Sequence, residues 1–245
     1  SNNNMQSLVR MRSKKSIFLL IIINFNLIKF ILTNQSQNYV DTNNSIQMKI
    51  SSSKRRVKII NFNSYYDYYI KYCPDFIYVD GIQTEIDENG YIDNDSHMLK
   101  NITMIWNYEV TSFQNLFFEV EDAIEIDLSK IDTSKVTSIE YMFSGCKQLK
   151  YINFGSIDTS SVETMECMFM NCISLLSLNM LNFNTSQVTS MSYMFYNCLL
   201  LSSLNISNFN TSQVIGTYSM FEGCQSLTSI DLTNFNTSSM NYMNR

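Results

Sequence analysis

Four of the six cysteines in this chain recur every 26 residues, and cysteine is the residue here best suited to metal binding or redox chemistry. They are Cys146, Cys172, Cys198 and Cys224. Structural metal sites draw several ligands from closely spaced cysteines or from histidines beside them. This spacing offers neither, so we expect no metal and no cofactor here. We favour packing, because a buried free cysteine behaves as a small hydrophobe.

A disulfide between neighbouring units stays open as an alternative. Stacked strands lie about 4.8 Å apart, inside the Cα range of a disulfide, although parallel side chains would have to leave their packed rotamers to bridge. Cys73 and Cys167 do not follow the period. Cys167 takes the place that Tyr141 and Tyr193 hold in their units, and we expect it to be the more reactive or intermolecular thiol.

A methionine and a phenylalanine precede each periodic cysteine at the same interval. The phenylalanines are Phe143, Phe169, Phe195 and Phe221. A large apolar residue at one fixed place in every unit is typical of a core column and not of a cofactor site. We therefore expect these phenylalanines and the periodic cysteines to form the core of the repeat.

Catalytic groupings are hard to find in the sequence. His97 is the only histidine and lies in a polar segment, so no serine–histidine or cysteine–histidine pair recurs with the repeat. None of the six glycines belongs to a phosphate-binding loop. Carboxylate pairs such as Glu119 and Glu121 exist, but nothing in the pattern selects them. We expect a protein that is not an enzyme and has no catalytic residues.

Two hydrophobic patterns follow one another within each 26-residue unit. The first, Leu149-x-x-Ile152-x-Phe154 and its copies, alternates like a short strand. The second begins with Val162 and Met165 and continues at three- and four-residue intervals, like one face of a helix, with a Thr-Ser pair before it as N-cap. The sequence therefore predicts an α/β solenoid, a leucine-rich-repeat-like array of 26-residue strand–helix units preceded by a small β-rich cap.

The side chains between the core positions of each expected strand would point away from the core and line an open sheet face. They form two columns: Tyr151, Ser177, Ser203 and Ser229, and Asn153, Asn179, Asn205 and Asp231. Small polar side chains over an extended surface suit hydrogen bonding to a protein or glycan ligand. The alternative is that they only solvate the sheet.

Three regions follow from these patterns. Residues 1–38 carry Arg10, Lys14 and an apolar run, and we expect a signal peptide or signal-anchor there. Residues 39–100 predict a small β-rich module with a polar linker and a hairpin that turns at Asp80-Gly81. Residues 101–245 form the repeat array, with a degenerate first unit, about four regular units and a truncated last one.

Acidic residues near Asp87 could bind calcium, but the chain lacks the usual calcium-binding loop, and a solvated turn is the preferred interpretation. The net charge of −5 offers no basic face for a nucleic acid, so we expect no such partner. Contact with a membrane is expected only through the N-terminal segment or an anchor beyond Arg245. Acceptor motifs for N-glycosylation agree with export: Asn43, Asn94, Asn101, Asn184, Asn205, Asn210 and Asn236.

The repeat resembles a known family. The stretches IEIDLSKIDTSKVTSIEYMFSGCKQLKYINF (124–154) and LNISNFNTSQV (204–214) are similar to the 26-residue unit of the BspA-like leucine-rich-repeat surface proteins. The resemblance covers about residues 105–240 and departs from the pattern at Val120, Ala123 and Gly216-Thr217. It implies an exported, non-enzymatic protein, secreted or at the cell surface, that mediates protein binding or adhesion. The alternative is a self-associating structural or coat scaffold without a foreign ligand.

Overall fold

The computed structural model describes residues 44–61, 73–94 and 99–240, which lie within one compact unit, and none of these residues is helical. The signal segment expected over residues 1–38 lies outside the described residues. Within them, nothing forms a helix that could cross a membrane. The ten strands are β1 (Ser45–Ile50), β2 (Arg56–Lys58), β3 (Phe76–Val79), β4 (Ile82–Gln83), β5 (Tyr91–Asp93), β6 (Lys100–Ile105), β7 (Ala123–Lys130), β8 (Tyr151–Asn153), β9 (Ser177–Asn179) and β10 (Ser203–Asn205).

The predicted hairpin at Asp80-Gly81 is confirmed. Strands β3 and β4 pair antiparallel, with Val79 opposite Ile82. Asp80 and Gly81 both have positive φ, at 50° and 81°, which is the geometry of the tight turns that join twisted hairpin strands. Aspartate and glycine are two of the residue types that adopt this conformation at low cost, so the local sequence determines the turn.

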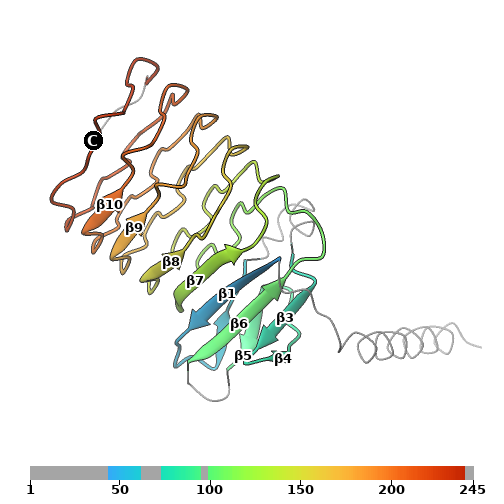
Figure 1. The fold of residues 1–245 in the computed structure, drawn as a ribbon. Helices are drawn as coiled ribbons and strands as arrows, with labels where there is room; N and C mark the ends of the chain where they lie inside the picture. The colour runs from blue at the N-terminus through green and yellow to red at the C-terminus, as the bar shows by residue number, and fades with distance from the viewer. Residues whose placement is uncertain (1–43, 62–72, 95–98, 241–245) are drawn as a thin grey trace, which may run out of the picture. The chain divides into compact units, whose positions relative to one another are not determined.

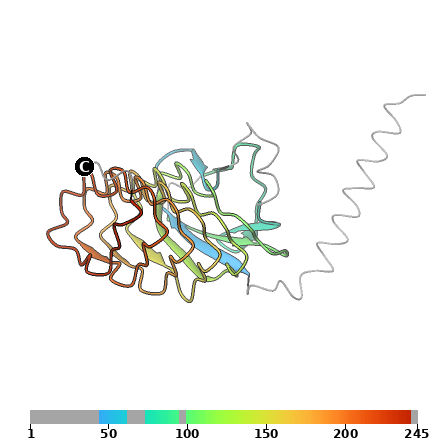
Figure 2. The same ribbon diagram turned by 90° about the horizontal axis from the view of Figure 1, so that it is seen from above.

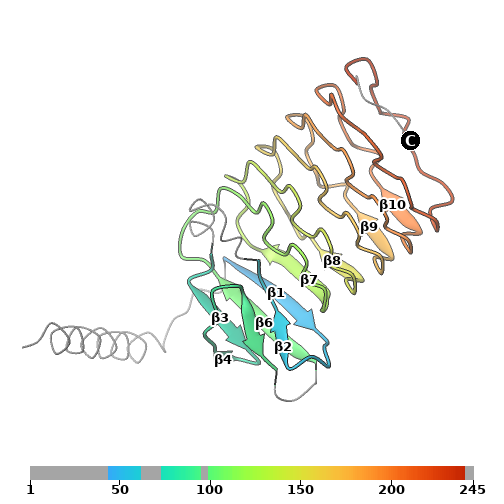
Figure 3. The same cartoon turned by 180° about the vertical axis from the view of Figure 1, so that it is seen from behind.

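A six-stranded sheet joins the N-terminal strands to the repeats, in the order β4-β3-β6-β1-β7-β8 (Figure 1). Figure 3 shows β3, β6 and β1 side by side from behind, with β7 and β8 continuing beyond them. Strand β1 pairs antiparallel with both β6 and β7, and β7 then pairs in parallel with β8. The N-terminal module therefore adds its strands to the edge of the repeat sheet.

Successive repeat units lie against one another in parallel (Figure 2). Strands β9 and β10 pair in register, with Leu178 opposite Leu204, 26 residues apart. On the other side of each unit, single parallel bridges link a second column of residues: Ser112, Ser138, Thr164, Ser190 and Gly216. Each unit thus contacts its neighbours at two places along the chain.

The prediction of an α/β solenoid, a leucine-rich-repeat-like array of strand–helix units, is wrong. The segments expected to be helices are chains of tight turns in every described unit. In one of them, the N–H groups of Met142, Ser144 and Cys146 donate to carbonyls three residues earlier, at Ile139, Tyr141 and Phe143. An α-helix would need bonds four residues apart at every position.

Left-handed backbone at two places in each unit explains why these segments turn instead of coiling into a helix. Tyr141 and Gly145 have φ of 54° and 77°, and Cys167 and Asn171 repeat this at 54° and 60°. Consecutive helical residues need negative φ, so a positive φ every fourth residue interrupts the helix. The second place carries only glycine, asparagine or glutamate in the described units, and glycine and asparagine tolerate this conformation best. The glycine or asparagine immediately before each periodic cysteine is the signal that predicts a turn.

The remaining N–H groups of these turns donate to the next unit. Those of Tyr141, Phe143 and Gly145 reach the carbonyls of Glu166, Met168 and Met170 at 2.8–3.0 Å. The pattern recurs in the following two units. Alternate backbone donors therefore close a local turn or bind the neighbour, and the buried backbone is satisfied without a helix.

Phenylalanine rings form a stacked column through the core. Rings of Phe117, Phe143, Phe169, Phe195 and Phe221 lie with their centroids 5.5–5.8 Å apart and their planes within 12° of parallel. The first four side chains of the column are fully buried, and Phe221 is half-buried against the core. Stacked apolar columns of this kind stabilise a repeat array through the interfaces between units.

The periodic cysteines lie beside this column as free thiols. Cys146, Cys172 and Cys198 are fully buried and Cys224 is half-buried. Each Sγ donates to a phenylalanine carbonyl of the preceding unit at 3.1 Å, for example from Cys172 to Phe143. A donating thiol must be protonated, so the column depends on neutral sulfur.

A threonine ladder replaces the predicted helix cap. The hydroxyl of Thr185 donates to the carbonyl of Asn210 at 3.0 Å and accepts from the N–H of the same residue at 2.8 Å. Thr133, Thr159 and Thr211 make the same pair of bonds to the following unit. The Asn or Asp before each threonine accepts from the N–H two residues on, which is an Asx turn. The Asn-Thr-Ser motif therefore links units.

Removing one hydroxyl from this ladder tests its contribution to stability. Thr185→Val leaves both backbone groups of Asn210 without their threonine partner, and we expect the free energy of unfolding to fall by about 2–4 kcal/mol. Thr185→Ser keeps the hydroxyl and loses one methyl group, worth about 0.8 kcal/mol. Urea unfolding of the two variants measures the difference. Equal losses in both variants would show that the hydroxyl does not stabilise the stack.

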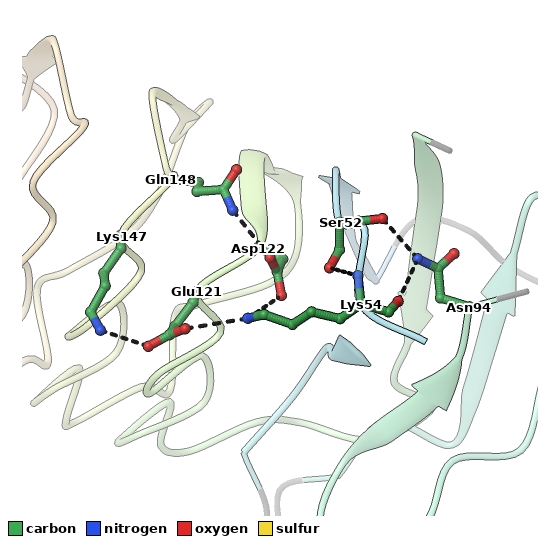
Figure 4. A network of polar contacts seen from close by, with 7 residues as sticks. All are labelled: Ser52, Lys54, Asn94, Glu121, Asp122, Lys147 and Gln148. Carbon is green, nitrogen blue, oxygen red and sulfur yellow. Dashed lines mark hydrogen bonds and ion pairs between the residues drawn. The ribbon is translucent and has the colours of Figure 1, made fainter. Parts of the chain in front are cut away.

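A cluster of ion pairs and hydrogen bonds connects the loop after β1 to the first two units (Figure 4). Lys54 Nζ lies 3.0 Å from the buried carboxylate of Asp122 and 3.4 Å from Glu121. Lys147 and Gln148, one unit later, bind the same two acidic residues at 2.7 and 3.1 Å. The hydrogen bond to Asp122 is the main cause that raises the pKa of Lys54. The cluster ties the N-terminal module to the repeats.

Asn94 belongs to the same region and has a fully buried side chain. Its amide donates to the carbonyls of Ser52 at 3.0 Å and Lys54 at 3.1 Å (Figure 4). A buried amide with two backbone partners is not accessible to glycosylation in the folded protein. In the folded protein Asn94 therefore stabilises the loop that contains Ser52 and Lys54 and is not a glycosylation site.

Candidate ligand-binding face

Two rows of outward-facing side chains run across four neighbouring strands of the six-stranded sheet. In the first row the register places Asn101 of β6, Lys49 of β1, Glu125 of β7 and Tyr151 of β8 next to one another. The second row is Thr103, Gln47, Asp127 and Asn153 in the same strand order. Residues two apart on a strand share one face, so all eight side chains lie on the same side of the sheet.

These rows line a hollow of about 440 Å³ on the sheet surface. Met48, Ile102 and Ile126 alternate with the lining residues along their strands, and their side chains are buried in the core beneath. A packed core under a polar surface keeps the lining positions fixed relative to one another. The volume falls within the usual range for small-ligand sites, which is about 300–1,000 Å³.

The charged side chains in the middle of the hollow are fixed by an ion pair and by hydrogen bonds to neighbouring residues. Lys49 Nζ lies 2.5 Å from Glu125 Oε2 in a half-exposed ion pair. The backbone N–H of Ser129 donates to Asp127 at 2.8 Å, and Asn153 forms a side-chain hydrogen bond with the same carboxylate. Burial opposes the charge of Asp127, but these hydrogen bonds and the nearby Lys130 outweigh it and lower its pKa. Asp127 is therefore anionic at neutral pH.

Three groups of the lining have no hydrogen-bond partner in the described part of the chain. They are the amide of Gln47 and the hydroxyls of Thr103 and Tyr151. Tyr151 is 52% exposed. The carboxylates at the centre are fixed acceptors, and the unengaged amide and hydroxyls around them can donate. Together with the aromatic ring, these groups can bind a polar ligand.

The structure brings only two of the eight predicted face residues, Tyr151 and Asn153, into this hollow. Ser177 and Asn179 lie on β9, and Ser203 and Asn205 on β10, where they face outward along the separate two-stranded sheet. Ser229 and Asp231 are exposed but belong to no strand. Asp231 instead accepts from the N–H and the hydroxyl of Thr233.

The other six polar lining residues come from the N-terminal module and the first unit, and the repeat pattern did not identify them. They are Gln47, Lys49, Asn101, Thr103, Glu125 and Asp127. Each stands in a stretch where polar and apolar residues alternate, such as Ser45–Ile50, which predicts a strand with one exposed face. The alternation predicts exposure, but the pairing of β1 with both β6 and β7 is what places the residues together.

The cysteines do not provide a second site. Burial raises the pKa of the thiols of Cys146, Cys172 and Cys198 well above the usual range. Cys167, expected to be the reactive thiol, is buried at 2% exposure, and burial raises its pKa to about 11. A nucleophilic cysteine needs a lowered pKa and access to solvent, so the expectation for Cys167 is wrong.

The acidic candidate for calcium binding near Asp87 belongs to a hydrogen-bonded turn. Asp87 accepts from the N–H groups of Asn89 and Tyr91 and pairs with Arg56, which makes it part of a turn. Across the described ranges, no three His, Cys, Asp or Glu residues gather where they could hold a metal ion. His97 lies outside the described residues.

Comparison with known proteins gives a family match over the repeats. The matching family model has the description Mycoplasma protein of unknown function, DUF285, and it matches residues 89–198 and 173–245. No curated protein and no solved structure matches the chain. Because the matched residues span more than half of the chain, the protein belongs to the DUF285 family.

Proposed function

We propose that this protein is a non-enzymatic binding protein, exported to the cell surface or secreted, whose hollow on the six-stranded sheet binds a ligand and thereby mediates binding or adhesion. The observation that carries the proposal is the hollow itself. Its eight polar side chains come from four strands and face one side of a sheet that is packed on a continuous core.

The chemistry of the described residues supports binding without covalent catalysis. All six thiols have a raised pKa, with burial as the main cause, so none is a ready nucleophile at neutral pH. In the hollow, Lys49 is paired with Glu125, and Asp127 is held by hydrogen bonds. A general base must instead be poised near neutral pKa within reach of a substrate proton.

The sequence supports export. Basic residues from Arg10 to Lys15 precede the apolar run that ends at Ile23, as in a secretory signal. Labelling of intact cells with a membrane-impermeant reagent tests the location. Labelling of the protein only after the cells are broken would contradict it.

An adhesion assay with the full chain tests the binding face. Beads carrying the protein are applied to surfaces that are each coated with one purified extracellular protein or one purified polysaccharide. Asn153→Arg and Gln47→Arg place a long cation in the hollow, and we expect retention on the preferred surface to fall at least tenfold. Gln187→Arg introduces the same side chain at an exposed position outside the hollow and should bind like the unmodified protein.

Two outcomes would overturn the proposal. The first is retention no better than on uncoated surfaces across the panel. The second is full retention by both hollow variants, with circular dichroism showing that they are folded. If the beads instead adhere to one another in proportion to the bound protein, the scaffold alternative is favoured, because a self-associating protein needs no coated surface.

A further inference from the structure

The polar lining of the hollow identifies the chemical class of its ligand, an inference that rests on the proposed function. The eight side chains comprise three amides, two carboxylates, two hydroxyls and one ammonium group. They include both donors and acceptors and are spread over four neighbouring strands, which lie about 4.8 Å apart. A ligand that satisfies them must itself carry many groups that both donate and accept, and hydroxyl groups do both.

The charge balance of the hollow disfavours an anionic ligand. Lys49, the one cation among the described lining residues, lies 2.5 Å from Glu125, so this charge is neutralised within the lining. Asp127 is the second carboxylate of the lining, is held ionised by its lowered pKa, and has Lys130 nearby as a partial counter-charge outside the lining. A sulfated, phosphorylated or carboxylated ligand would meet repulsion and would have to break the ion pair to gain a partner.

One aromatic ring breaks the repeat pattern at the rim of the hollow. Tyr151 stands in a column where the following units carry Ser177, Ser203 and Ser229. No described residue hydrogen-bonds its hydroxyl, and the residue is 52% exposed. An exposed tyrosine offers an apolar face and a polar tip at low cost in conformational entropy.

Tyr151 is the one large hydrophobic residue of the lining that is exposed, since the side chains of Met48, Ile102 and Ile126 are buried beneath. Protein-binding hot spots are centred on several buried aromatic or apolar anchors, and this surface offers one. The apolar face of a pyranose ring can cover a single tyrosine ring while its hydroxyls reach the amides and carboxylates beside it. A neutral sugar therefore fits the lining better than a protein surface does.

We infer that the hollow binds a neutral oligosaccharide, with Tyr151 stacked against one sugar ring and Gln47, Thr103 and Asp127 hydrogen-bonded to its hydroxyls. The fixed contacts of Asp127 and Asn153 hold the acceptor in place before the ligand arrives. Gln47 and Thr103, whose side chains have no hydrogen-bond partner among the described residues, supply donors that can adjust to the ligand.

The test uses the full chain on an array that presents neutral oligosaccharides beside their sulfated and sialylated counterparts. We expect binding to at least one neutral oligosaccharide and at least tenfold weaker binding to its acidic counterparts. Tyr151→Ser, which installs the residue of the other units, should weaken binding at least tenfold, whereas Tyr151→Phe should keep most of it. Tyr218→Ala, which removes an exposed tyrosine elsewhere, is the matched control.

A second variant is expected to weaken the preference for neutral oligosaccharides. Glu125→Gln frees Lys49 and removes one negative charge, and we expect binding of sulfated counterparts to rise relative to the neutral ones. Preference of the unmodified protein for acidic glycans, or no difference between Tyr151→Ser and Tyr218→Ala, would overturn the inference. If only protein-coated surfaces retain the chain and the hollow variants abolish this retention, the proposed function stands and the oligosaccharide inference fails. If the unmodified protein binds neither the array nor any coated surface, both the proposed function and the oligosaccharide inference are overturned.

Discussion

Raising the pH from 9 to 11 is expected to destabilise the protein strongly. The thiols of Cys146, Cys172 and Cys198 are fully buried, and burial raises their pKa far above the ordinary value of 9.0. Above pH 9 these thiols ionise only in the unfolded chain, so the unfolded state binds fewer protons and the stability falls as pH rises. Three thiols together give a loss of about 4 kcal/mol per pH unit, against a total of about 5–15 kcal/mol for a typical domain.

Urea unfolding at several pH values between 7 and 10.5 measures this loss. Below pH 9 the thiols are protonated in both the folded and the unfolded chain, so their ionisation should not shift the urea midpoint there. Cys172→Ala removes one titrating thiol, and the fall in stability above pH 9 should become shallower by about 1.4 kcal/mol per pH unit. An unchanged slope in Cys172→Ala would assign the alkaline instability to other groups.

Truncating the middle of the phenylalanine column is the second change expected to have a large effect. The ring of Phe169 is fully buried and stacks on Phe143 and Phe195 at 5.5 and 5.6 Å. Phe169→Ala removes contacts with both neighbouring units and leaves a cavity, and we expect the free energy of unfolding to fall by about 3–5 kcal/mol. Chemical denaturation followed by far-ultraviolet circular dichroism gives the value.

Phe118→Ala provides the control, because Phe118 is only half-buried and makes an edge contact with Tyr141. Its truncation should cost less than about 1.5 kcal/mol. Similar losses in the two variants would mean that the stacked column is not a principal source of stability. Fluorescence of Trp106, which is buried directly after β6 and so beside the N-terminal strands, reports whether these strands and the repeats unfold together.

The repeat and its strands could be predicted because the information is local. The alternating pattern around Ile152 identifies β8, and Asp80-Gly81 identifies the hairpin. The turn segments could not be recognised from hydrophobic spacing alone. Linked turns and a helix both bury residues three and four apart, as at Met165 and Phe169, so the same pattern fits both structures.

The binding face was only partly predictable, for a different reason. Tyr151 and Asn153 follow from the repeat, because every unit places the same positions on the outside. Lys49 and Asn101 lie in the hollow only because β1 inserts between β6 and β7, a pairing of segments that are far apart in sequence. Hydrophobic alternation determines which face is exposed but carries no information about which strand becomes the neighbour.

The threonine ladder has a consequence for the length of the molecule. Each rung joins a unit to the next through the same positions, so removing one block of 26 residues beyond β8 would bring together groups of the same kind as before. The hollow draws only on β6, β1, β7 and β8, which precede those blocks. The number of repeats can therefore change in whole steps without altering the residues of the hollow, so under the proposed function the array would set the distance between the hollow and whatever follows it.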